Sequence, residues 1–191
     1  MAVQALPRKI TYEEWLQMPE TNQPCEIIDG EIRMSPAPNV MHQRLVRRLL
    51  LLLEKFVPED KGELLPSPVD VIVSRSPFKT RQPDIMVVLF RESGWQNLQA
   101  VLEAPSGEVV PDLVVEVLSP SERRQSVEEK IEDYRRIGVR EFWLVSPEAE
   151  TVEVLRLGEA GIERIGLYGR GDIVRSELLP ECQIDTNRLF A

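Results

Sequence analysis

Histidine is the scarcest reactive residue of this chain, because His42 is the single one among 191 residues. A Ser-His-Asp triad would have to use this residue, and a multi-histidine metal site cannot form within one chain. The two cysteines, Cys25 and Cys182, lie far apart and belong to no CxxC or Cys/His pattern, which argues against a zinc site and a disulfide scaffold. Carboxylate chemistry with a hard, oxygen-binding cation fits this composition better.

The sequence also lacks a long hydrophobic run. No segment approaches the roughly 18 uninterrupted apolar residues of a membrane span, and residues 1–10 lack the apolar central region of a secretory signal. The composition, 42% hydrophobic and 29% charged, is ordinary for a globular protein with one core. We therefore expect a single domain over residues 1–191, located in the cytoplasm and without a membrane partner.

Basic residues are outnumbered, since 23 Lys and Arg face 32 Asp and Glu and the formal net charge is −9. A protein that binds nucleic acid over a broad surface is usually basic, so the net negative charge argues against an extended basic surface for nucleic acid. Local basic patches remain compatible with it. Two groups of arginines are close in sequence: Arg44, Arg47 and Arg48, and Arg123, Arg124, Arg135, Arg136 and Arg140.

Two apolar segments of strand-like composition each contain one acid of interest. Glu116 lies inside the β-branched run of residues 111–120, where an unpaired charge is costly and implies a partner. This run is apolar on both faces, which is typical of a strand in the middle of an α/β sheet. Asp84 opens a second apolar run within residues 82–90.

The distances within and between strands select which acids can meet. Residues on neighbouring strands lie about 4.8 Å apart, so Asp84 and Glu116 can converge. Asp112 and Glu116 are four residues apart on one strand, which is about 13 Å, so they cannot bind the same ion. We expect Asp84, Glu116 and a backbone carbonyl, that of Val117, to hold a divalent ion that keeps several waters, as magnesium prefers.

Two predicted helices carry further candidates. The first begins after the N-cap Asn39, extends to about Val57 and places His42 inside its apolar stripe, either as a core histidine bonded to a backbone carbonyl or as a site residue. The second covers about residues 125–137 and places Lys130 in its inward arc. Lys130 could stabilise negative charge on a phosphate or orient an attacking water. Alternatively, its aliphatic chain could pack against the core while the ammonium group reaches solvent.

The N-terminal region is predicted to contain a β-hairpin. Asp29-Gly30 between short apolar runs indicates a two-residue type I′ turn joining residues 26–28 and 31–34. Glu31 takes the face opposite to the apolar residues of its strand. It could complete the shell of an ion, or it could be an ordinary solvated residue.

The remaining elements complete the expected fold. We predict a short helix at residues 10–18, strands at 69–73 and 141–145, a loop at 74–81, an irregular or partly helical segment at 91–107 and a C-terminal hairpin of residues 151–157 and 162–168. The fold class is therefore α/β, with a central mixed β-sheet flanked by helices.

Several motifs together resemble the Uma2 family, a branch of the PD-(D/E)XK nuclease superfamily. They are Glu26-Ile-Ile-Asp-Gly-Glu31, Met34-Ser-Pro-Ala-Pro followed by His42-Gln43, Gln82-Pro-Asp84, Pro111-Asp-Leu-Val-Val-Glu116-Val-Leu-Ser-Pro120, Lys130, Tyr134 and Gly138-Val-x-Glu-Phe-Trp-Leu-Val145. The resemblance spans nearly the whole chain. It implies a restriction-endonuclease-like core and cleavage of DNA phosphodiester bonds with Mg²⁺ or Mn²⁺, and analogy with nucleases that cut two strands suggests a homodimer.

The resemblance also assigns candidate roles. Asp84 and Glu116 match the two motif acids, but Leu118 stands where the superfamily has a basic residue. The resemblance suggests that Lys130 replaces that residue from the following helix. Glu31 and His42 match further motif positions, and Tyr134, one helical turn from Lys130, is a candidate to support the site.

Two other functions remain open from the sequence. The net charge of −9 and the missing motif lysine favour an interaction module that keeps the nuclease fold and binds nucleic acid or protein without cleavage. The joint presence of Asp84, Glu116 and an inward lysine weighs against it. A small-molecule metallohydrolase has only the acidic surface in its favour.

Overall fold

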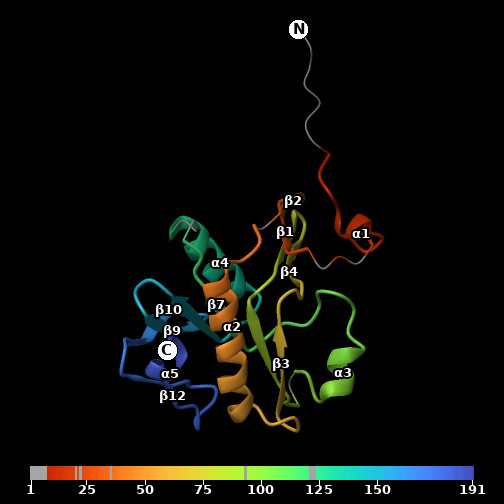
Figure 1. Ribbon diagram of the computed structural model, residues 1–191. Coiled ribbons are helices and arrows are strands. Elements are labelled where there is room, and N and C mark those ends of the chain that lie inside the picture. Colours follow the sequence, from red (N-terminus) through yellow and green to blue (C-terminus); the bar gives the residue numbers. More distant parts are fainter. Residues whose placement is uncertain (1–7, 20, 22, 35, 93, 121–123) are drawn as a thin grey trace.

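The computed structural model, which describes residues 8–191 except 20, 22, 35, 93 and 121–123, is built around a six-stranded sheet (Figure 1). The strands are β3 (Gly62–Pro66), β6 (Ile85–Leu89), β7 (Leu113–Val117), β8 (Glu141–Ser146), β9 (Thr151–Gly158) and β10 (Gly161–Tyr168). Their order is β10-β9-β8-β7-β6-β3. β7 and β8 are parallel and the other neighbours antiparallel, so the sheet is mixed.

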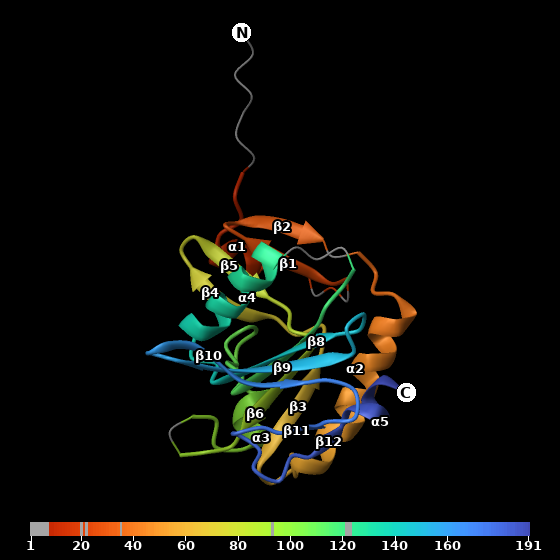
Figure 2. The ribbon, with the colours of Figure 1, turned by 90° about the vertical axis from the view of Figure 1, so that its left-hand side faces the viewer.

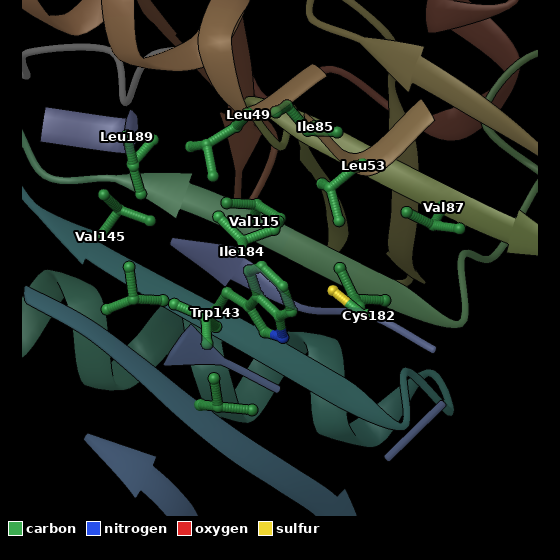
Figure 3. Close-up of a cluster of buried hydrophobic side chains, with 14 of the residues drawn as sticks. Leu49, Leu53, Ile85, Val87, Val115, Trp143, Val145, Cys182, Ile184 and Leu189 are labelled. Atoms are coloured by element: carbon green, nitrogen blue, oxygen red, sulfur yellow. The ribbon is translucent and has the colours of Figure 1, made fainter. Parts of the chain in front are cut away.

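Two helices cover opposite faces of this sheet, as Figure 2 shows: α2 (Val40–Leu53) and α4 (Arg124–Arg136). Because side chains alternate along a strand, β7 presents Val115 to the core under α2 and Val114 to the core under α4. Figure 3 shows the α2 side, where Leu49 and Leu53 lie against the sheet. β7 is therefore buried on both faces and apolar except for Glu116, as the sequence predicted.

Three small two-stranded sheets surround the main sheet: β1 (Cys25–Ile28) with β2 (Glu31–Met34), β4 (Val71–Arg75) with β5 (Phe78–Arg81), and β11 (Ile173–Val174) with β12 (Ile184–Asp185). The turn between β1 and β2 has positive φ at Asp29 (53°) and Gly30 (80°), as a type I′ turn requires. The Ile27 amide donates to Thr80 Oγ1 of β5 at 3.1 Å. The first hairpin therefore packs on the second, through β1.

The shorter helices lie outside the two main layers. They are α1 (Tyr12–Trp15), the 3-10 turn η1 (Glu54–Phe56), α3 (Leu98–Leu102) and α5 (Thr186–Phe190). α1 has the predicted capping box between Thr11 and Glu14, although it is shorter than the predicted residues 10–18. None of the helices that the structure describes is long and apolar enough to cross a membrane.

The predicted fold class is confirmed, and two details of the prediction were wrong. Residues 74–81 are not a simple loop, because residues 78–81 form β5. Its sequence, Phe-Lys-Thr-Arg, is too polar to suggest a strand, and the buried Arg81 is accommodated by ion pairs. The edge strand β3 was not predicted, since its run is short and ends at Pro66, a residue tolerated at sheet edges.

The packing of α2 makes a testable prediction. Leu49 is fully buried, so Leu49→Ala should lower the free energy of unfolding by about 2–5 kcal/mol by leaving a cavity against the sheet. Leu51→Ala, on the exposed side of the same helix, is the matched control and should change it by less than about 0.5 kcal/mol. Urea denaturation measures both; equal losses would contradict the observed orientation of α2.

Candidate active site

Asp84 and Glu116 lie side by side because of the pairing between β6 and β7. The last paired residues are Ile85 and Val115, and continuing this register by one residue places Asp84 opposite Glu116. The Val117 amide donates to Asp84 Oδ2 at 2.7 Å, which fixes the Asp84 carboxylate across the end of β7. The two acids thus adjoin on neighbouring strands, while Asp112 lies near the other end of β7, paired with Arg91 and Arg140.

Helix α4 supplies both hydrogen-bond partners of Glu116. Lys130 Nζ lies 3.0 Å from Glu116 Oε2, and the Tyr134 hydroxyl donates to Oε1 at 2.9 Å. Lys130 and Tyr134 are four residues apart, so they lie on one face of the helix, above the same carboxylate. Lys130 thus points at the sheet, and its ammonium reaches Glu116.

Burial dominates the electrostatics of Glu116. Loss of solvation raises the pKa of this carboxyl to about 7; Lys130 acts in the opposite direction, and the nearby charges of Asp84 and Glu26 raise it further. Burial also raises the pKa of the Tyr134 phenol, which therefore remains a hydrogen-bond donor at neutral pH. A cation bound beside Glu116 would therefore add to the effect of Lys130 and stabilise the ionised carboxylate.

His42 approaches Asp84 from the other side of the sheet. Asn39 caps α2 by accepting a hydrogen bond from the His42 amide at 2.8 Å, which places His42 in the first turn. His42 Nε2 lies 3.2 Å from Asp84 Oδ2, and this contact is the main reason why the imidazole pKa is raised. Nδ1 is buried and has no hydrogen-bond partner among the described residues. Nε2 meets the Asp84 carboxylate, and a hydrogen bond with the Val117 backbone also helps to raise the imidazole pKa, so the backbone partner that the sequence left open contributes as well.

These side chains line one cavity of about 640 Å³. Asp84, Glu116, Val117, His42 and Lys130 are all in its wall, whereas Tyr134 lies behind Glu116, fully buried.

Glu31 is the candidate that the structure does not bring to this cavity. It is exposed on β2 and is not among the residues that line the cavity, whereas Glu26 of β1 is. The reason is that β1, not β2, packs on β5. The sequence held a signal for this: Ile27 and Ile28 are consecutive apolar residues, which predicts that β1 is the more buried strand and that its acid is the more enclosed one.

Leu118 turns away from the site. It packs against the core under α4 and lines a second, smaller cavity, so it leaves the space beside Glu116 to Lys130.

Most of the clustered arginines bind protein groups. Arg44 and Arg48 donate to backbone carbonyls at the C-terminal end of the described chain, and Arg124, Arg135 and Arg136 pair with glutamates of α4. Arg123 lies outside the described residues. Arg47 is exposed and lines the cavity, so it is the member of the first cluster that adjoins the site.

The oxygen atoms in the cavity wall suit a hard divalent cation whose coordination shell is completed by water. Asp84 and Glu116 offer carboxylate oxygens, and Val117 offers a backbone carbonyl on the same wall. Within the part of the chain that the structure describes, no three Asp, Glu, His or Cys side chains are close enough to surround a metal ion. A cation here would therefore keep several waters, as magnesium does.

The buried Glu116 carboxyl predicts a pH dependence in metal-free protein. Between pH 4.5 and about 7 the folded protein retains a proton that the unfolded chain has released, so Glu116 makes the free energy of unfolding decrease as the pH rises. The amide of Glu116→Gln stays neutral. We therefore expect the difference in the free energy of unfolding, Glu116→Gln minus parent, to become more positive between about pH 5 and about pH 8.

Urea denaturation in EDTA at both pH values measures this difference. Glu159→Gln, in the exposed turn between β9 and β10, is the control and should track the parent. A Glu116→Gln difference that does not change with pH would contradict the burial of an ionisable carboxyl at this position.

Comparisons with known proteins agree with the fold. The crystal structure of a putative nuclease belonging to DUF820 from Anabaena variabilis ATCC 29413 matches with a TM-score of 0.72 at 22% identity, over 95% of this chain and 97% of that chain, which shows a shared fold. No curated protein matches. The model of the Uma2 family, described as "Putative restriction endonuclease", matches residues 12–187. The chain therefore belongs to the Uma2 family.

Proposed function

We propose that this protein is a divalent-metal-dependent endonuclease that hydrolyses DNA phosphodiester bonds. The observation that carries the proposal is the adjoining pair of Asp84 and Glu116 on neighbouring strands, with Lys130 Nζ 3.0 Å from Glu116. The description of the family and the nuclease named in the similar crystal structure support the same class of reaction. A cytoplasmic location and a homodimer stay predictions from the sequence.

Each residue of the site has a distinct task in this proposal. Asp84, Glu116 and the Val117 carbonyl would hold Mg²⁺ or Mn²⁺, which supplies a water of lowered pKa and positive charge for the phosphate. Lys130 brings a second positive charge to the developing charge on the phosphate. Tyr134 fixes the Glu116 carboxylate, and His42 fixes that of Asp84.

The charge distribution shapes the expected substrate interaction. The net charge is −9, and most of the clustered arginines already bind protein groups. Arg47 and Lys130 provide positive charge at the cavity. We therefore expect contacts to a few phosphates near the cleaved bond, and a weak dependence of binding on salt.

Cleavage assays separate this function from a binding module that keeps the nuclease fold. Purified protein incubated with plasmid, linear duplex and single-stranded DNA should cut with Mg²⁺ or Mn²⁺ and remain inactive in EDTA, and Glu116→Gln should reduce cutting to the level of buffer alone. Cutting that survives in Glu116→Gln would indicate a contaminating nuclease. DNA binding by a protein that never cuts would favour the binding module.

Metal binding separates the roles of the charged residues. Asp84→Asn should lose Mn²⁺ binding in titration calorimetry, because a neutral amide is a weaker ligand than a carboxylate. Lys130→Met should still bind Mn²⁺ but cut about 10²–10³-fold more slowly, the usual loss when a group that stabilises transition-state charge is removed. Normal Mn²⁺ affinity in both Asp84→Asn and Glu116→Gln would contradict the proposed ligands.

A further inference from the structure

A buried arginine joins the N-terminal hairpin to helix α4 beside the active site. Arg81 of β5 is 4% exposed. Its Nε and Nη2 donate to Asp133 Oδ2 at 2.9 and 2.6 Å, and its Nη1 donates to Glu26 Oε2 at 2.8 Å. The planar guanidinium therefore fixes two carboxylates from two different elements in one geometry.

The other groups around Arg81 balance its charge. Asp133 is also buried and receives a second basic partner, Lys79, whose Nζ lies 2.8 Å from Oδ1. Two basic and two acidic side chains thus form one network between β1, β5 and α4. Because Lys79 also pairs with Asp133, the Arg81 guanidinium can form an ion pair with Glu26 as well. Arg81→Lys would keep a charge there but would lose the fork that orients Glu26.

Glu26 is the end of this network that reaches the cavity. It lines the same cavity as Asp84, Glu116 and Lys130. Oε2 is held by Arg81, whereas Oε1 has a long contact, 3.5 Å, with the Gln82 amide. Oε1 therefore retains capacity to accept hydrogen bonds from the cavity.

The spacing of the acids limits what Glu26 can do. Among the described residues, Glu26 does not join Asp84 and Glu116 in a group of three that could surround one ion. A cation bound by those two residues would keep several waters. A carboxylate that lies beyond direct coordination can accept hydrogen bonds from these waters and orient them.

We propose that Glu26 is a third acidic group of the active site, which accepts hydrogen bonds from the water of the bound cation, and that Arg81, fixed by Asp133, is the positioning residue that holds Glu26 there. This inference rests on the proposed metal site at Asp84 and Glu116. It assigns a catalytic use to an ion network that would otherwise serve only to attach the hairpin to α4.

Metal titration tests this inference without relying on cleavage. The Mn²⁺ affinities of parent, Glu26→Gln, Arg81→Lys and Glu26→Gln/Arg81→Lys are measured by calorimetry, together with their thermal unfolding. Glu26→Gln should remain folded and bind Mn²⁺ about 10–100-fold more weakly, the usual effect of removing an outer hydrogen-bond partner. Because Arg81 acts through Glu26, the double variant should bind as weakly as Glu26→Gln and no more weakly.

An ion pair between Arg75, at the end of β4, and Glu108, in the segment after α3, supplies the matched controls. Glu108→Gln and Arg75→Lys make the same chemical changes in a pair whose arginine is largely solvent-exposed, and they should leave the Mn²⁺ affinity at the parent value.

The outcomes distinguish the two proposals. If Glu116→Gln loses Mn²⁺ and Glu26→Gln binds it as tightly as the parent, the role of Glu26 is wrong while the metal site stands. Additive losses in the double variant would overturn the positioning role of Arg81. If the parent binds no Mn²⁺, both proposals fail. Should Arg81→Lys not fold, Asp133→Asn replaces it in the cycle, and Glu26→Gln alone still decides the role of Glu26.

Discussion

The antiparallel pairing of β6 with β7 is the constraint on which the site depends. Its register sets two carboxylates opposite each other at the end of the pairing, one of them in a buried strand. Like charges at this distance repel, and burial adds to the cost of ionising Glu116. Contacts from Lys130 and Tyr134 to Glu116, and from His42 and the Val117 amide to Asp84, offset part of this cost.

The layered fold makes those contacts possible. Because α2 and α4 cover opposite faces of the sheet, one helix brings His42 to Asp84 while the other brings Lys130 and Tyr134 to Glu116 (Figure 2). The lysine comes from a helix instead of from the strand of Glu116, since Leu118 packs into the core under α4. Packing of α4 on the sheet thus places a positive charge 3.0 Å from Glu116 Oε2.

The ion network behind the cavity connects a peripheral hairpin to the cavity wall. Arg81 is buried, and a buried arginine is stable only when its donors are paired. Its two partners come from β1 and α4, so the position of Glu26 depends on the docking of both elements. The hairpin therefore contributes to the charge of the cavity through β1, while no residue of the exposed β2 lines it.

The sequence by itself determined the mixed α/β fold, both main helices and the two predicted hairpins, because hydrophobic periodicity and turn residues are local signals. It also predicted that Asp84 and Glu116 could meet, and the pairing of β6 with β7 places them side by side. It also indicated that His42 and Lys130 face inward, since their wheel positions follow from spacing alone. It missed β3 and β5, whose short or polar runs become strands only by pairing with neighbours. Which hairpin acid reaches the cavity was decided by tertiary structure: the choice of Glu26 over Glu31 depends on the docking of β1 on β5 and on Arg81, contacts between residues more than fifty positions apart.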